Sequence, residues 1–130
     1  MSLNGNVTSA AAVTVDSSAG AVSQTADPLA VSVVPAVVNA AADVSLAGAV
    51  SAALVDVDAT GGSLSVNDLT ATSGALTLDA TGAVSVVGDL TAATTLGVTS
   101  SAGGVTQSTG STMSGVGALT VSSRNNAVLA

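Results

Sequence analysis

The chain has 130 residues with a formal net charge of −7, and it contains no aromatic residue, cysteine or histidine. Arg124 is the one basic residue, and all eight acidic residues are aspartates. These counts exclude Ser-His-Asp and Cys-His catalysis, zinc sites built from Cys or His, and phosphate recognition by Lys and Arg. We therefore expect no enzyme, no cofactor and no nucleic-acid partner.

The apolar and polar residues of this chain favour strands over helices. Hydrophobic residues make up 48 % of the sequence, but Val, Leu and Ala must form the core because aromatic residues are absent. The polar residues are mostly Ser, Thr, Asn and Asp, which compete with helical hydrogen bonding or are β-branched. The apolar stretch 29–57 contains Pro35, Asp43 and Asp56 and no basic flank, so we expect no insertion into a membrane.

In chain order, residues 1–12 form a lead-in, and copies of one pattern then start near positions 13, 34, 55, 76, 96 and 119. Each copy has an alternating apolar strand, a turn of Ser, Thr and Gly, and a second short strand. A third short strand lies between copies, at Leu29–Val31, Val50–Ala52, Leu69–Ala71, Leu90–Ala92 and around Met113. This alternation is typical of strands that bury one face.

The period of the repeat determines the predicted fold. The sequence Asp-Ala-Thr-Gly occurs at Asp58 and again at Asp79, which are 21 residues apart. A unit of this size buries only one face of each strand, so it needs neighbouring copies to complete a core. We predict a single all-β domain over residues 1–130, a right-handed parallel β-helix (β-solenoid) of about six coils of about 21 residues with three short strands per coil.

Two columns of apolar residues should point into this solenoid. They comprise Val13, Val55, Leu76, Leu96 and Leu119 and, beside them, Val15, Val57, Leu78, Val98 and Val121. Thr14, Thr77 and Thr120 should point outward. A β-sandwich would not require the 21-residue period, and a helix over 36–54 is disfavoured by the alternation of Val44, Ser45 and Leu46.

The aspartates are the only candidates for a binding site. Asp58 should stack on Asp79, and Asp68 on Asp89, at a coil spacing where a Ca²⁺ ion could bridge two carboxylates. The alternative interpretation is that each aspartate closes a turn by accepting hydrogen bonds from nearby backbone, and we favour it. We therefore assign no metal, and we keep these four residues as weak calcium candidates.

The repeat resembles the shaft repeats of filamentous-haemagglutinin-like exoproteins, which are long bacterial adhesins exported by two-partner secretion. The resemblance covers about residues 7–130, and it rests on 17–24, 100–107, 74–78 and 117–121, for example Ser-Ser-Ala-Gly-Ala-Val-Ser-Gln at 17–24. It implies a right-handed β-helix at an extracellular or bacterial cell-surface location, with a spacing or adhesive role. The resemblance implies no catalytic residue.

These observations lead to three hypotheses on function. The first is a structural or adhesive shaft segment of a secreted surface protein, covered by flanking coils of a longer chain. The second is an extracellular filament subunit that stacks coil on coil with other copies of itself, because 127–130 is apolar and shows no polar cap. The third, an ice-binding solenoid, needs a regular threonine ladder, which Gly97 interrupts. A host or surface receptor is not identifiable from these residues.

Overall fold

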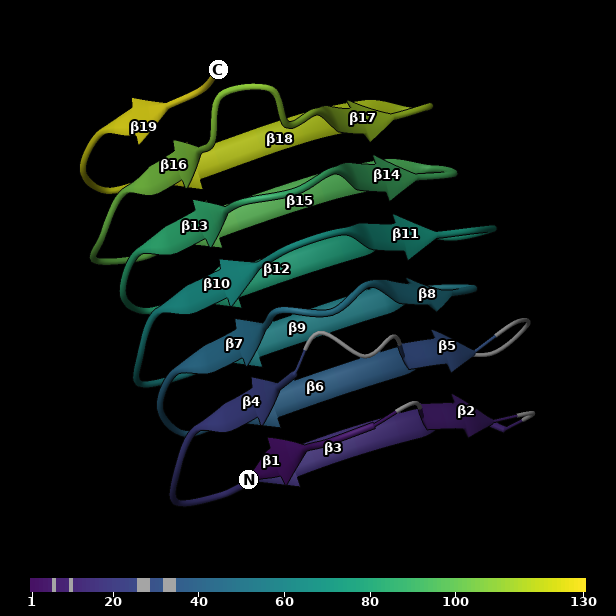
Figure 1. Ribbon diagram of the computed structural model, residues 1–130. Helices are drawn as coiled ribbons and strands as arrows, with labels where there is room; N and C mark the ends of the chain where they lie inside the picture. Colours follow the sequence, from purple (N-terminus) through teal and green to yellow (C-terminus); the bar gives the residue numbers. More distant parts are fainter. Residues whose placement is uncertain (6, 10, 26–28, 32–34) are drawn as a thin grey trace.

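The computed structural model describes the whole chain except residues 6, 10, 26–28 and 32–34. Among the described residues all regular structure is β-strand, and the strands stack into a rod with the chain termini at opposite ends (Figure 1). No helix in the described part of the chain is long and apolar enough to cross a membrane.

Each coil contributes one strand to each of three parallel sheets. Sheet A comprises β1 (Ser2–Leu3), β4 (Val22–Gln24), β7 (Val44–Leu46), β10 (Leu64–Val66), β13 (Val84–Val86), β16 (Val105–Gln107) and β19 (Ala127–Val128). Sheet B comprises β2 (Val7–Ser9), β5 (Leu29–Val31), β8 (Val50–Ala52), β11 (Leu69–Ala71), β14 (Leu90–Ala92) and β17 (Met113–Gly115). Sheet C comprises β3 (Val13–Ser17), β6 (Ala36–Ala40), β9 (Val55–Ala59), β12 (Leu76–Ala80), β15 (Thr95–Ser100) and β18 (Ala118–Ser123).

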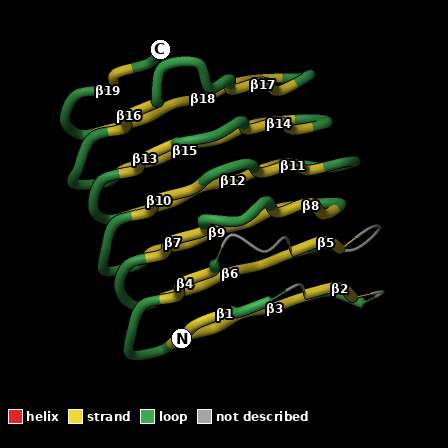
Figure 2. The backbone as a smooth tube through the Cα atoms, viewed as in Figure 1, coloured by secondary structure: helices red, strands yellow, loops and turns green. Residues whose placement is uncertain are grey.

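The predicted fold is confirmed: the chain is a parallel β-solenoid of about six turns, spaced about 21 residues apart. Figure 2 shows short strands alternating with turns in every coil. The segment 36–54 forms β6, β7 and β8, so its interpretation as strand rather than helix is also confirmed. The copy start expected near Val34 lies outside the described residues. Ala36 holds the equivalent place, because it pairs with Val13 on one side and Val55 on the other.

The core is a set of apolar columns that run along the rod. In one column of sheet C, Val55, Leu76 and Leu96 are buried, and in the next, Val57 and Leu78 are fully buried. Small side chains suit this interior because each layer receives only a few of them from three short strands. Each fully buried Val or Leu contributes roughly 1.5–3 kcal/mol.

The expected columns are incomplete at the two ends of the rod. Leu119 holds an inward position in β18, in register with Leu96, but 46 % of its surface is exposed. Val13 and Val121 are only partly buried. The prediction that Leu119 is buried is therefore wrong, because no further coil covers the outer side of β18 in this structure. Thr14 and Thr120 point outward as predicted, and Thr77 is partly exposed on the same face.

Side chains in the turns hold each coil to the previous one. The Thr60 hydroxyl donates to the carbonyl of Ala40 over 3.0 Å, and the Thr81 hydroxyl donates to the carbonyl of Thr60 over 2.7 Å. On the Asn67 side chain, Nδ2 donates to the carbonyl of Ala47. The frequent Thr, Ser and Asn of the turns thus connect coils, and this is the physical reason for their recurrence in the repeat.

The C-terminal end has a partial polar cap that the sequence analysis did not foresee. The Gln107 side chain is buried, its Nε2 donates to the carbonyl of Ser111 over 2.7 Å, and its Oε1 accepts from the backbone N–H of Ala130. The loop between β16 and β17 rises toward the chain terminus beside β19 (Figures 1 and 2). The cap therefore covers part of this end, and the edge of sheet C stays open.

Candidate functional site

The outer face of sheet C is the surface on which most aspartates of the strands gather. Two columns of outward side chains run along it, one nearer the start of each strand and one two residues further on. The first column comprises Thr14, Val37, Asp56, Thr77, Gly97 and Thr120, and the second comprises Asp16, Asn39, Asp58, Asp79, Thr99 and Ser122. Neighbours within a column lie about one strand spacing apart, roughly 4.8 Å.

Three aspartates of this face lie on two adjacent strands. Asp58 of β9 is paired in register with Asp79 of β12, as the sequence predicted, and Asp56 lies two residues before Asp58. Desolvation by burial, together with the Asp79 carboxylate, raises the pKa of Asp56 above its ordinary value. Desolvation likewise raises the pKa of Asp58, with further contributions from the charges of Asp56 and Asp79. The three carboxylates therefore repel one another on the folded rod.

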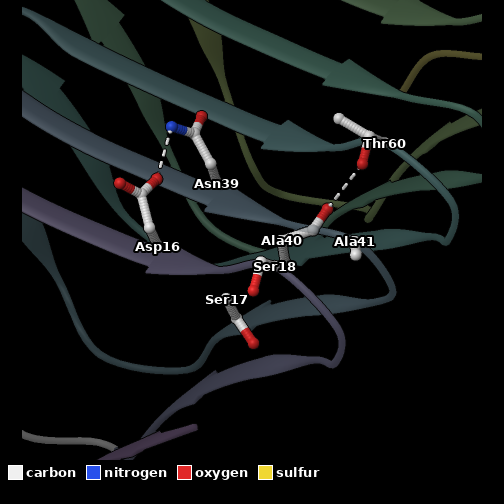
Figure 3. Close-up of a pocket in the computed structure, with 7 residues that line it drawn as sticks. All are labelled: Asp16, Ser17, Ser18, Asn39, Ala40, Ala41 and Thr60. Atoms are coloured by element: carbon white, nitrogen blue, oxygen red, sulfur yellow. Dashed lines mark hydrogen bonds between the residues drawn. The ribbon is translucent and has the colours of Figure 1, made fainter.

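A shallow hollow of about 380 Å³ lies at the end of this face, where sheet C turns toward sheet A. Figure 3 shows that Asp16 and Asn39 lie side by side within it, and Asn39 Nδ2 donates to Asp16 Oδ1 over 2.8 Å. Thr60 closes the other side through its hydrogen bond to the carbonyl of Ala40. The side chains of Asp16, Asn39 and Thr60 are thus engaged in hydrogen bonds, whereas Figure 3 draws none for the hydroxyls of Ser17 and Ser18.

A second hollow of about 150 Å³ continues along the same edge, lined by Asp58, Asp79, Thr81, Thr99 and neighbouring turn residues. The two hollows share the turn at Thr60. Together they form a shallow strip along the rod, lined by alanines and by polar groups that are carboxylates, hydroxyls and one amide. Such groups suit hydration or weak cation contact.

The second predicted aspartate pair has a different role. Asp68 and Asp89 lie in successive turns, and Asp68 Oδ1 accepts the backbone N–H of Asp89 over 2.8 Å. Asp89 Oδ1 in turn accepts both the backbone N–H and the hydroxyl of Thr112, over 2.7 and 3.0 Å. These carboxylates therefore bond the backbone of the following coil. The prediction that each aspartate closes its own turn is therefore corrected for Asp68 and Asp89. Both accept hydrogen bonds from backbone, but that backbone belongs to the next coil.

The turn-closing interpretation is wrong for Asp58 and Asp79, because both lie inside strands. Within the described part of the chain, no three His, Cys, Asp or Glu side chains gather in a way that could hold a metal ion. The calcium hypothesis stays an untested prediction for all four aspartates.

The faces of the rod do not favour the ice-binding alternative. In the triplet Thr70-Ala71-Thr72, Thr70 lies on the outer face of β11, but the Thr72 hydroxyl donates to the carbonyl of Ala52 in the turn. The sheet with two outward columns is sheet C, and it carries aspartates between its threonines. A flat, regular threonine surface is therefore not formed by these residues.

Sequence reasoning missed the residues that act at the ends of the rod. Gln107 occupies an inward position equivalent to Val86, and its polar side chain forms the partial cap. A polar residue at an inward position of the repeat was the available signal. Apolar side chains are exposed near the same end, at Val116, Leu119, Val128 and Leu129.

Comparison of the chain with protein-family models, curated proteins and solved structures gives no match. Its function is therefore argued from the features described above: a continuous core, a shallow strip with carboxylates and hydroxyls along the rod, and ends at which the core columns are open.

Proposed function

We propose that the chain is a structural, β-helical shaft segment of a secreted bacterial surface protein, which spaces or presents an adhesive part. The observation that supports this role most directly is the continuous apolar core from coil to coil. Because every coil is held by its neighbours, further coils lengthen the rod without changing its cross-section. Six coils correspond to a length on the order of 30 Å.

The surface of the rod is consistent with this role. The outward side chains of sheet A include a column of small hydroxyls, at Ser23, Ser45, Ser65, Ser85 and Thr106. Such side chains are well solvated and carry no charge. With a net charge of −7, copies of the rod also repel one another sideways, which keeps an exposed shaft soluble. Its partners along the axis are flanking coils or other copies, and its receptor is undefined.

The location and the shaft role are tested by antibodies raised against the purified chain. On intact cells of the source organism we expect labelling, and we expect added protease to remove it. Antigen confined to the fraction inside intact cells would overturn the proposal. The spacing role is tested by repeating residues 64–83, one coil, after Ala83. Small-angle X-ray scattering should show a rod longer by about 4.8 Å, whereas a 20-residue Gly-Ser insert should not lengthen it in this way.

A second candidate function is an extracellular filament subunit that stacks coil on coil. The exposed inward side chain of Leu119 favours it, since a further coil would bury this residue as the coil that contains β18 buries Leu96. Sedimentation velocity over a concentration series tests this candidate. Growth of long species with concentration supports it, and a single species of one chain at all concentrations rejects it.

A further inference from the structure

The two outermost strands of sheet C are β3 at the N-terminal end and β18 at the C-terminal end. Each pairs with one neighbour in the described structure, β3 with β6 and β18 with β15. All strands of the sheet run in the same direction, so the open edge of β18 matches the open edge of β3 without rotation of either rod. An edge with unpaired backbone groups is a template for pairing with another chain.

We propose that β18 of one copy pairs in parallel with β3 of a second copy, in the register that the repeat already uses. This inference rests on the second candidate function, self-assembly, and names the contact through which it would occur. In this register Leu119 of the first copy meets Val13 of the second, and Val121 meets Val15. The contact covers the exposed side of Leu119 and continues both apolar columns across the junction.

Charge complementarity favours the same register. Ser122 comes to lie against Asp16 of the second copy, and the exposed Arg124 follows two residues later along the chain. A long side chain reaches a diagonal neighbour two positions away on the adjacent strand, at about 7–8 Å. Arg124, the single cationic side chain, can therefore meet an aspartate at the opposite end of a second rod.

In sheet A, two strands would compete for one position at this junction, β19 of the first copy and β1 of the second. Among the described residues this sheet has seven strands, whereas sheets B and C have six, because β19 lies on β16 as an additional layer. In the proposed register, β1 of the second copy would fall in the layer that β19 fills. Val128 pairs with Thr106, so the next residue, Leu129, lies at the position beside Gln107. Gln107 belongs to the same column as Gln24, which pairs with Leu3, and Leu129 is therefore equivalent to Leu3. We infer that β19 takes the place of β1, which detaches from the second copy.

A contact of this kind joins different surfaces on the two partners. Repetition of this contact along one axis does not close into a ring, so the expected product is an open filament. The cap at Gln107 lies at the end of β16, and the loop that follows it runs from sheet A to β17 of sheet B. They leave the β18 edge free but limit the contact between sheets A and B, which makes sheet C the principal interface.

Engineered disulfides test the register, and the absence of native cysteine makes the result specific. The proposed pairing places Thr120 opposite Thr14 of the next copy, at a Cα separation of about 4.8 Å that a disulfide can bridge. The variant Thr14→Cys/Thr120→Cys should form a ladder of covalent oligomers on oxidation. The matched control, Thr77→Cys/Thr120→Cys, has its first cysteine in the same column within a strand paired on both sides. It should form at least tenfold less of the ladder.

The outcomes separate the inference from the proposed function. If long species form in sedimentation but the two cysteine pairs crosslink equally, the β18–β3 register is wrong and self-assembly stands. If no long species form at any concentration, self-assembly fails and the inference fails with it, while the shaft proposal is unaffected.

Charge reversal and truncation test the remaining contacts by sedimentation. Arg124→Asp should weaken association about fivefold, the upper range for an exposed ion pair, and the exchanged pair Asp16→Arg/Arg124→Asp should restore it. Removal of residues 127–130 should strengthen association, because it removes the competitor of β1. Melting curves confirm that each variant folds. Association that is unchanged by charge reversal, or weakened by the truncation of a folded chain, would contradict the proposed junction.

Discussion

The sheet C strands of the fourth and the sixth coil share the sequence Leu-Thr followed by Leu78 or Val121, but their apolar side chains have different environments. Leu76 in β12 is fully buried, with 0 % of its surface exposed, whereas Leu119 at the equivalent place in β18 is 46 % exposed. Both leucines point into the solenoid. The difference comes from the coil that follows, which is present for the fourth coil and absent for the sixth in this structure.

This comparison shows that burial in a solenoid depends on the neighbouring coils as well as on the sequence of each coil. Stability should therefore be high in the middle of the rod and lower at its ends, as in other repeat proteins. The turns also depend on the neighbouring coils, because their side chains form hydrogen bonds to the backbone of the adjacent coil. The following predictions compare the two regions, from the largest expected effect to the smallest.

The largest difference is expected between Leu76→Ala and Leu119→Ala. Loss of the buried leucine should lower the free energy of unfolding by about 2–5 kcal/mol, because a cavity remains between two coils. The same substitution at Leu119 should lower it by less than about 1 kcal/mol in a single rod, since much of the side chain is already in water. Urea denaturation at low protein concentration measures both. Equal losses at the two sites would show that the sixth coil is covered in solution.

Two glycines, Gly103 in a turn and Gly97 within β15, provide a second comparison. A Cβ on Gly103 would lie 2.6 Å from the backbone nitrogen of Ala83 in the preceding coil, whereas a Cβ on Gly97 would meet no atom within 4 Å. We expect Gly103→Ala to cost about 1–3 kcal/mol through overpacking of the turn. Gly97→Ala should be neutral or stabilise the strand by up to about 1 kcal/mol. Thermal unfolding of the two variants is the measurement, and a neutral Gly103→Ala would mean that the coils can separate locally.

The attachment of the last coil depends partly on one carboxylate. Asp89→Ala removes the acceptor of two hydrogen bonds from Thr112 and should destabilise the chain by about 1 kcal/mol, with faster amide exchange in β17 than in β11. Asp89→Asn keeps an oxygen acceptor and serves as the control. If both variants lose the same stability, the charge of Asp89 matters more than the two hydrogen bonds.

Much of the fold could be predicted because two features of the repeat indicate it. These are the alternation of apolar and polar residues within each strand and the regular spacing of the turns. The third strands, such as β11 and β14, were placed at their observed bounds from alternation alone. Leu119 could not be judged in this way, because its pattern matches that of Leu96 and only the missing neighbour distinguishes the two. The aspartate register of Asp58 and Asp79 followed from the period.

The role of Asp68 and Asp89 was less accessible from the sequence. Their acceptor oxygens bond the next coil, and such a contact depends on the path of the turn between strands. The cap at Gln107 likewise depends on the loop that precedes β17. A repeat therefore predicts which residues stack, but the partners of turn side chains require the three-dimensional path of each turn.

The smallest effect concerns the pH dependence of the middle of the rod. Burial, followed by repulsion from neighbouring carboxylates, raises the pKa of Asp56 and of Asp58 in the folded chain above the ordinary value of 3.8. Between the unfolded and the folded pKa the folded chain binds more protons, so stability falls as the pH rises through this interval. We expect Asp58→Asn to melt at a slightly higher temperature than the parent chain at pH 7, with the difference vanishing below the ordinary pKa.

Asp16→Asn is the matched control for this effect, because it removes the same charge from the same column two coils away. Its carboxylate accepts a hydrogen bond from Asn39 and lies outside the group formed by Asp56, Asp58 and Asp79. Thermal melts of the three chains between pH 3 and pH 7 compare the two sites. If Asp16→Asn raised the melting temperature as much as Asp58→Asn, the effect would come from the net charge of −7 and not from crowding of carboxylates in the middle coils.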